Sequence, residues 1–273
     1  MKKKTVLVMV ILFLLYGQGI HAAANISYKI EMLPWEDVNQ ILPKYSKFTV
    51  LDLESGKKFK VQRRAGSRHA DVQPLTPKDT KIMKKVYGGK WSWKRRAIVV
   101  ISKDQWIAGS MHGMPHGAGA LKNNFPGHFC IHFYGSTTHR TSTMDLSHML
   151  MIYKAAGKLE EYLSKTSPYE TVEAYIAGLK QQDAYTSKLI SLQKVQWKPI
   201  LGKIENVRIT RMPILPAEDL KNEISMDVPV EIDWFIKNRG RQHFSGEIHL
   251  IRYSTMDAWK VDSESFLKEN NLQ

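Results

Sequence analysis

The chain has 273 residues, a formal net charge of +14 at pH 7 and a hydrophobic content of 43%. This length is enough for one large domain or two ordinary domains. The single cysteine excludes a disulfide within the chain, and beyond the first residues no stretch is long and apolar enough to span a membrane.

The first residues have the order of a secretory signal peptide. Lys2, Lys3 and Lys4 precede an apolar run at residues 6–16, and three alanines follow at 22–24. The apolar run is too short to span a bilayer comfortably, so we predict a signal peptide over residues 1–24. An uncleaved N-terminal anchor is the alternative, and it is the only membrane contact that we expect.

The positive charge predicts an anionic partner, and export indicates which kind of anionic polymer the protein can meet. Without the three lysines of the signal peptide the net charge is about +11, and a strongly basic protein is attracted to anionic polymers. An exported protein meets the cell wall rather than nucleic acid. We therefore expect a secreted, extracytoplasmic protein that binds peptidoglycan or another anionic wall polymer, with solubility alone as the alternative role of the charge.

Residues 25–165 have the pattern of an α+β domain that consists mostly of strands. Two alternating segments flank a glycine turn at 54–57 and predict a hairpin. Thr76, Pro77 and Gly88 have the positions of an N-cap, a first helical residue and a helix stop. Further strands are predicted at 28–33, 95–102, 105–111 and 128–135, and apolar residues at helical spacing predict a helix over 145–165.

Residues 167–273 begin with a second helix signal and continue as strands. Ser167, Pro168 and Glu170 match an N-cap, a proline at the first helical position and a capping-box acid. Alternating apolar residues then predict antiparallel strands at 194–200, 206–212, 224–238, 244–254 and 258–265. Asp233, His243 and His249 fall on these strands, and we interpret them as residues of a sheet face.

The segments SPYETVEAYIAGLKQQD, residues 167–183, and HLIRYSTMDAWKVD, residues 249–262, open and close this second unit. Together they resemble the nuclear-transport-factor-2-like (SnoaL-like) domains. The resemblance implies a cone-shaped α+β accessory domain over residues 167–273 that positions the protein or binds a partner.

Histidines cluster around the only cysteine, Cys130. Six of the nine histidines outside the signal peptide lie between residues 112 and 148, namely His112, His116, His128, His132, His139 and His148. A cysteine nucleophile needs a histidine within hydrogen-bond reach that takes its proton and populates the thiolate. It also needs polar groups that hold the developing oxyanion. The sequence MHGMPHG supplies two candidate bases, and a Pro-Gly turn precedes the cysteine strand.

The segment MHGMPHGAGALKNNFPGHFCIHF, residues 111–133, resembles the active-site signature of L,D-transpeptidases, exported enzymes that cross-link peptidoglycan through a cysteine acyl-enzyme. The resemblance implies a mostly-β catalytic domain over residues 25–165 that needs no metal or other cofactor. It makes Cys130 the nucleophile and His112 the base, oriented by the Gly113 carbonyl. It also implies that His128 and the main chain around Phe129 shape the oxyanion site.

Several positions depart from that signature or extend it. Gly127 stands where Ser or Thr is usual, and Phe129 stands where Gly is usual. His116 is an equal candidate for the base, because Pro115 and Gly117 would fix its loop. Four further residues are candidates for a supporting shell: His132, His139, His69 and Asp71.

Two other functions fit the same residues. His69, Asp71, Cys130 and several histidines could hold zinc, which accepts N, O and S ligands, as in a zinc-dependent cell-wall peptidase. The spacing of the His112/His116 and His128/His132 pairs lacks the helix and Glu of the common zinc peptidase motif. A non-catalytic peptidoglycan-binding protein would need only the basic surface, with Cys130 as a small buried hydrophobe.

Overall fold

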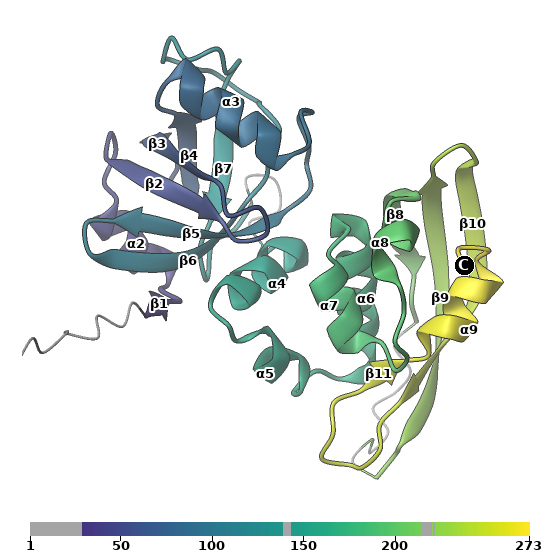
Figure 1. Cartoon of the computed structure of the whole chain (residues 1–273). Helices are drawn as coiled ribbons and strands as arrows, with labels where there is room; N and C mark the ends of the chain where they lie inside the picture. Colours follow the sequence, from purple (N-terminus) through teal and green to yellow (C-terminus); the bar gives the residue numbers. More distant parts are fainter. Residues whose placement is uncertain (1–28, 139–142, 214–219, 221) are drawn as a thin grey trace, which may run out of the picture.

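The computed structural model describes residues 29–138, 143–213, 220 and 222–273, so the predicted signal peptide lies outside the described residues. The described strands form two separate sheets, with helices between and around them (Figure 1). The strands are β1 (Ile30–Glu31), β2 (Lys47–Asp52), β3 (Lys58–Ala65), β4 (Ala70–Pro74), β5 (Arg96–Ser102), β6 (Gln105–Met111), β7 (Phe129–His132), β8 (Ile204–Arg211), β9 (Ser225–Ile236), β10 (Gly240–Ile251) and β11 (Lys260–Val261). The helices are α2 (Trp35–Ile41), α3 (Pro77–Val86), α4 (Leu146–Ala155), α5 (Leu159–Leu163), α6 (Pro168–Gln181), α7 (Ala184–Ile190), α8 (Trp197–Leu201) and α9 (Ser263–Glu269).

The first sheet closes into a barrel. Its strand order is β1-β6-β5-β2-β3-β4-β7, and β7 also pairs with β6. The predicted hairpin is confirmed: β2 and β3 pair antiparallel from Lys47↔Gln62 to Leu51↔Lys58, and Gly56 in the turn has φ 66°. Closure places β7, the strand of Cys130, between β4 and β6, so residues from three strands converge on one place.

The predicted helix starts are confirmed by their caps. The Thr76 side chain accepts a hydrogen bond from the Asp79 N–H, and the Asp79 carboxylate accepts one from Thr76 in return. Ser167 and Glu170 form the same reciprocal box at the start of α6. Each box satisfies N–H groups that the first helical turn leaves without partners.

The single helix predicted over 145–165 is wrong. Two helices, α4 and α5, occupy this range, and Gly157 between them has φ 69°. A left-handed residue ends an α-helix, and glycine adopts that conformation without the steric cost that a side chain brings. Asp145 caps the first of the two helices through the His148 N–H.

The second unit is a helical layer packed on the antiparallel sheet β11-β10-β9-β8. The strand predicted at 194–200 is wrong: Trp197, Ile200 and Leu201 are buried on one side of the short helix α8, a spacing of three and four that suits a helix. The strand predicted at 258–265 is correct only for β11, because Asp262 caps α9 directly afterwards. The architecture is thus mixed α and β, with a closed barrel and a curled sheet.

The two units share buried surface. One apolar core fills the barrel, and a second core joins α4 to α6 and to the C-terminal sheet and includes Ala97 and Ala108 of the barrel wall. The Arg95 N–H donates to Gln181 Oε1 at 2.7 Å, and Lys154 of α4 pairs with Asp183. The predicted domain boundary at 165–167 falls between α5 and α6. However, α4 contacts both units, namely β5 and β6 of the barrel and α6 of the second unit.

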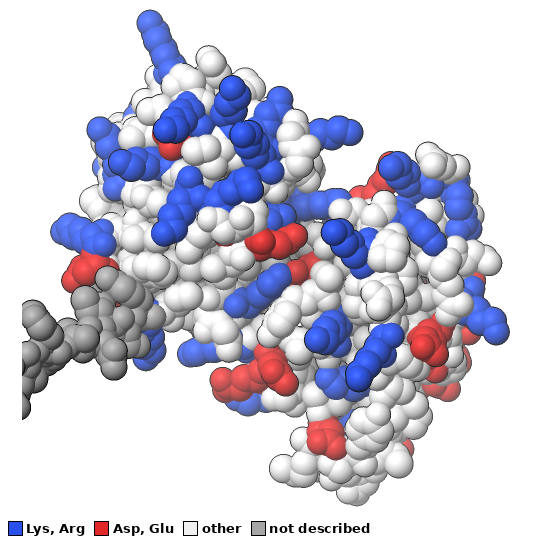
Figure 2. Space-filling view, viewed as in Figure 1, with Lys and Arg blue, Asp and Glu red and all other residues white. Residues whose placement is uncertain are grey.

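Lys and Arg side chains cover much of the barrel on the face shown in Figure 2, as the net charge predicts. In the described part of the chain, the helices are all too short or too polar to cross a bilayer.

Candidate functional site

Cys130 lies on the outer face of the barrel wall. Its neighbours Phe129 and Ile131 belong to the barrel core, and because side chains alternate along a strand, Cys130 and His132 project to the opposite face. Cys130 is paired with Asp71 of β4, and His132 with Ser110 of β6. The expected contribution of Phe129 to an oxyanion site is therefore limited to its main chain, because its side chain is buried among apolar groups.

His116 is held over Cys130 by the main chain. The N–H groups of His116 and His128 each donate to the carbonyl of the other, both at 2.9 Å. Gly127 allows this approach, because it has φ 122° and a Cβ there would lie 2.5 Å from the His116 carbonyl oxygen. The Gln73 side chain secures the loop between them, since it donates to the Gly127 carbonyl and accepts from the Ala120 N–H.

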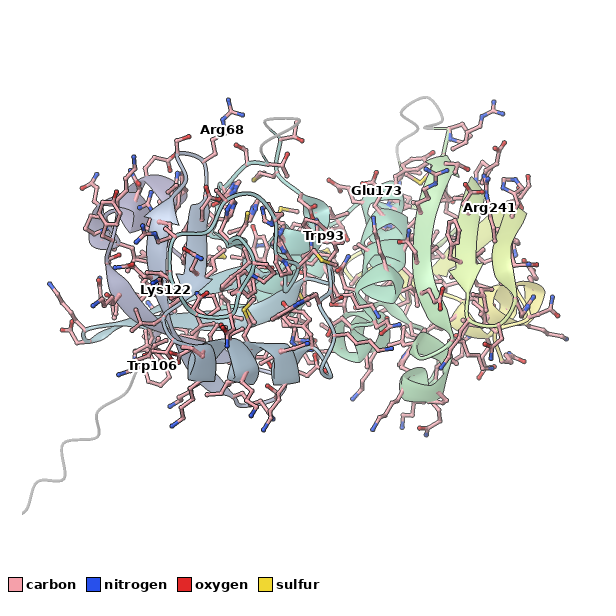
Figure 3. All side chains as sticks on the ribbon, turned by 90° about the horizontal axis from the view of Figure 1, so that it is seen from above. Arg68, Trp93, Trp106, Lys122, Glu173 and Arg241 are labelled. Atoms are coloured by element: carbon pink, nitrogen blue, oxygen red, sulfur yellow. The ribbon has the colours of Figure 1, made fainter. Side chains whose placement is uncertain are left out.

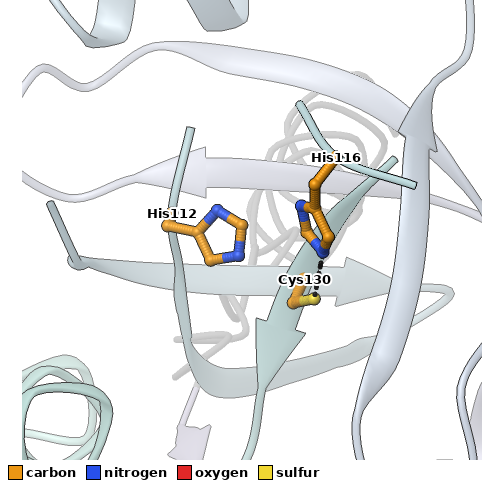
Figure 4. Close-up of side chains that lie close together, drawn as sticks. All are labelled: His112, His116 and Cys130. Atoms are coloured by element: carbon orange, nitrogen blue, oxygen red, sulfur yellow. Dashed lines mark hydrogen bonds between the residues drawn. The ribbon is translucent and has the colours of Figure 1, made fainter. Parts of the chain in front are cut away.

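His116 and Cys130 form a hydrogen-bonded pair. His116 Nε2 lies 3.4 Å from Cys130 Sγ, and His116 Nδ1 lies 3.2 Å from the Met114 carbonyl oxygen (Figure 4). A carbonyl can only accept, so in the neutral imidazole Nδ1 carries the proton and the Nε2 lone pair faces the thiol. This tautomer is ready to take the Sγ proton, and the Met114 carbonyl orients the His116 ring.

His112 completes a triad with His116 and Cys130, in which one ligand atom of each residue lies within 4.8 Å of the others (Figure 4). The residue is 4% exposed, and within the described residues its Nδ1 has no hydrogen-bond partner. Burial, with the nearby Arg95 charge, lowers the pKa of His112 to about 2. The adjacent Gly113 packs against the Tyr87 ring, where a Cβ would lie 2.4 Å from it.

A second group of polar side chains meets the thiol from the other side. Asp71 Oδ1 lies 3.6 Å from Cys130 Sγ, 3.3 Å from His69 Nε2 and 3.8 Å from His128 Nε2. His69 Nδ1 lies 2.8 Å from the Thr137 carbonyl oxygen, and His128 Nδ1 lies 3.1 Å from that of Ala118. These two histidines and His116 thus each place Nδ1 on a main-chain carbonyl and turn Nε2 toward Asp71 or Cys130.

Burial and the negative charge of Asp71 raise the pKa of the Cys130 thiol well above its ordinary value. The resting thiol is therefore protonated, and the expected resting thiolate is not supported. Desolvation disfavours any charged form, and a carboxylate beside the sulfur disfavours the anion further. Activation of this thiol requires transfer of its proton to a neighbouring base during the reaction, or replacement of the proton by another cation.

His69, His132 and His148 form a stack of rings beside Cys130. The His132 ring lies 4.4 Å from that of His69 and 3.8 Å from that of His148 on α4, with interplanar angles of 14° and 11°. His148 Nδ1 lies 2.9 Å from Ser110 Oγ, and burial keeps the pKa of His148 well below its ordinary value. His139 lies outside the described residues. The other predicted site histidines and Asp71 all converge on this region.

Trp93 lies at the edge of the site, on the side of the barrel that faces α6 (Figure 3). Its ring centroid is 4.7 Å from that of His112 and 5.5 Å from that of His116. A cavity of about 460 Å³ begins beside it and is lined by Met114, Lys94, Arg95 and Lys180 among others. The sequence marks Trp93 and Arg95 as part of a basic, tryptophan-containing segment that could bind a glycan or an acidic peptide, with a strand edge as the preferred interpretation, and does not connect them to Cys130. It does not indicate His148 as a site residue, because only the packing of α4 brings this residue to the site.

Comparison of the chain with protein-family models, with curated proteins and with solved structures gives no match.

Proposed function

We propose that this protein is an exported cysteine acyl-transferase or peptidase that acts on the stem peptides of peptidoglycan, with Cys130 as nucleophile and His116 as base. The observation that carries the proposal is the 3.4 Å contact between Cys130 Sγ and Nε2 of His116. A thiol with a positioned imidazole is the arrangement that cysteine acyl transfer needs. The resemblance of residues 111–133 to the L,D-transpeptidase signature supports the same chemistry.

The proposed reaction has two steps. In the first, Sγ bonds to the carbonyl carbon of an amide while its proton moves to His116 Nε2, and the amine leaves with that proton. In the second, an amine or a water attacks the thioester, and His116 accepts the proton of the attacking group. Sγ then leaves and recovers a proton from His116. Transfer and hydrolysis differ only in the acceptor, so one site serves both.

His116 replaces His112 as the proposed base. The pKa of His112 is lowered to about 2, so a proton is held weakly there, and its ring is buried beneath Trp93. The N–H of His128 is already donated to the His116 carbonyl, which removes it from the expected oxyanion site. The proposal therefore leaves the ring of His128, at the mouth of the site, as the part of this residue that could contact substrate.

The C-terminal unit, with its nuclear-transport-factor-2-like resemblance, is proposed to position the barrel on its substrate. The cavity beside Trp93 lies between the barrel and α6 and is lined by Lys94, Arg95, Lys180 and one acid, Glu205. Arg95 already pairs with Asp145, so Lys94 and Lys180 are the groups that suit a peptide carrying carboxylates, and stem peptides of the cell wall are of that kind.

The test is to trap the acyl-enzyme by intact-protein mass spectrometry. The metal-free mature protein is mixed with a synthetic stem tetrapeptide and with its activated thioester. We expect an adduct on Cys130 that is absent in Cys130→Ser and strongly reduced in His116→Ala, whereas His112→Ala still forms it. Absence of an adduct with both reagents, or equal rates in His116→Ala and wild type, contradicts the proposal and favours a non-catalytic wall-binding protein.

A further inference from the structure

Cys130 has a second set of neighbours that the proposed acyl transfer does not use. Asp71 is the direct cross-strand partner of Cys130, and His69 precedes Asp71 by two residues. One ligand atom from each of these three residues lies within 4.8 Å of the other two. All three side chains belong to buried residues, with exposures of 1% for His69, 7% for Asp71 and 3% for Cys130. Such a group of N, O and S donors, closed off from water, suits one borderline-soft metal ion.

The spacing of these atoms fits a tetrahedral zinc ion. With ordinary Zn–N, Zn–O and Zn–S bonds, the N···O edge of a tetrahedron is about 3.4 Å and the O···S edge about 3.6 Å. The His69 Nε2–Asp71 Oδ1 distance is 3.3 Å, and the Asp71 Oδ1–Cys130 Sγ distance is 3.6 Å. Two edges of the coordination polyhedron are therefore already formed by the protein.

The orientation of His69 suits a cation at this place. Its Nδ1 lies 2.8 Å from the Thr137 carbonyl oxygen, so Nδ1 carries a proton and Nε2 points at the carboxylate oxygen of Asp71. Either a proton on Nε2 or a metal ion between the two atoms makes this contact favourable. A histidine that ligates a metal commonly donates its other N–H to a backbone carbonyl in this way.

The surroundings keep these ligands in place. The His132 ring stacks on that of His69, and the His148 ring stacks on that of His132. Cys130 and Asp71 are fixed by the pairing of β4 with β7. His128 Nε2 lies 3.8 Å from the same Oδ1, close enough to approach a fourth coordination position.

We infer that His69, Asp71 and Cys130 bind one zinc-class divalent cation and that this cation competes with His116 for the thiol. Binding replaces the Sγ proton with the metal and releases that proton to solvent. The metal withdraws charge from the sulfur and makes it a weaker nucleophile than the free thiolate, so the metal-loaded protein is the resting form of the proposed enzyme. Only the regulatory role of the metal rests on the proposed function. The metal site itself is inferred from the positions of His69, Asp71 and Cys130.

The experiment titrates the metal-stripped mature chain with Co²⁺ and with Zn²⁺. We expect one equivalent of Co²⁺ to give a thiolate-to-cobalt charge-transfer band in the near ultraviolet, and Zn²⁺ to displace it. His69→Asn should lose at least about tenfold in affinity, and Cys130→Ser should lose the band. His112→Ala, which alters the other triad, should keep both the affinity and the band. Cooperative thermal unfolding of each variant establishes that it is folded.

Two results overturn the inference: no stoichiometric binding by the wild type, or loss of binding in His112→Ala with retention in His69→Asn. Failure of the inference is distinguishable from failure of the proposed function, because the two depend on different histidines. If only the metal site is wrong, Cys130 still forms the acyl-enzyme through His116 and binds no metal. If only the acyl transfer is wrong, the cobalt band appears and no thioester forms.

Discussion

Two buried aspartates, one in each half of the molecule, each have a histidine neighbour yet differ in their other partners. Asp233 in the C-terminal sheet accepts hydrogen bonds from Arg208 at 2.8 Å, from Arg241 at 3.0 Å and from His243 at 3.2 Å. Asp71 in the barrel wall meets His69, Cys130 and His128 at 3.3, 3.6 and 3.8 Å. The N···O contacts of Asp233 are all 3.2 Å or shorter, whereas the N···O contact of Asp71 with His69 is 3.3 Å, and its hydrogen bond from the Cys130 thiol has the greater length that sulfur brings.

The difference separates a structural carboxylate from a reactive one. The hydrogen bonds from Arg208 and His243, with the charge of Arg241, hold the pKa of Asp233 at about 2, and the two guanidinium groups keep their charge at any ordinary pH. Around Asp71 the neighbours are imidazoles and a thiol, groups that exchange protons or bind metals. The same residue types therefore stabilise a sheet in one place and form a candidate site in the other.

The largest expected effect is on the reaction. His116→Ala should slow acylation of Cys130 by about 10²–10⁴-fold, the usual contribution of a general base. His243→Ala, which removes the histidine beside Asp233 instead, should leave the rate unchanged. Single-turnover acylation followed by mass spectrometry measures both. A comparable loss in His243→Ala would show that the contrast between the two sites is mistaken.

The second effect concerns the reactivity of the thiol in the metal-free protein. Asp71→Asn removes a negative charge that raises the pKa of Cys130, so the thiolate population should increase about tenfold for each unit by which that pKa falls. Alkylation by iodoacetamide between pH 7 and pH 10 measures the change, with Asp233→Asn as the matched control. Slower alkylation in Asp71→Asn at every pH would contradict the assigned role of this charge.

The third effect is the acid sensitivity of the C-terminal sheet. The pKa of Asp233 in the folded protein, about 2, lies below its ordinary value of 3.8. Its ionised form therefore stabilises the fold above that ordinary value, and the contribution disappears as the pH falls from about 4 toward 2. Asp233→Asn should lower the melting temperature at pH 6 and differ little from wild type near pH 2. If the two melting temperatures differed by the same amount at pH 6 and pH 2, the effect would come from changed packing rather than from the lost charge.

The smallest expected effect is the loss of stability when the N-cap residue of a capping box is removed in either unit. Thr76→Ala at α3 and Ser167→Ala at α6 should each cost about 1 kcal/mol of unfolding free energy, because each removes the acceptor of an N–H group in the first turn. Urea unfolding measures both, and Lys78→Ala at an exposed position of α3 is the control. Unchanged stability in both cap variants would mean that solvent replaces the lost bonds.

Local features of the fold were predictable from the sequence, because they depend on neighbouring residues. The hairpin around Gly56 and the helices that begin after Thr76 and Ser167 follow from turn and cap chemistry. The error at 194–200 arose because a short apolar segment fits strand and helix patterns alike. The end of α4 was signalled by Gly157, whose role was overlooked among otherwise helical residues.

The candidate site was predictable only in part. Proximity of Cys130 to a histidine of the loop followed from the motif, although the sequence left His112 and His116 equal. The choice between them depends on the Met114 carbonyl and the bridge to His128, which are matters of backbone geometry. That Asp71 lies opposite Cys130 depends on the register of two strands 59 residues apart, and no local pattern encodes such a register.

The paired main-chain bonds between His116 and His128 have a consequence for related sequences. They join the two ends of the segment 117–127, so the base and the nucleophile keep their distance as long as this bridge holds. Within the segment, Gln73 holds Ala120, and Asn123 and Phe125 are buried. Loop-closure entropy grows only slowly with length, so insertions should be tolerated best at the exposed Lys122, and a search for distant relatives should allow a gap of variable length there.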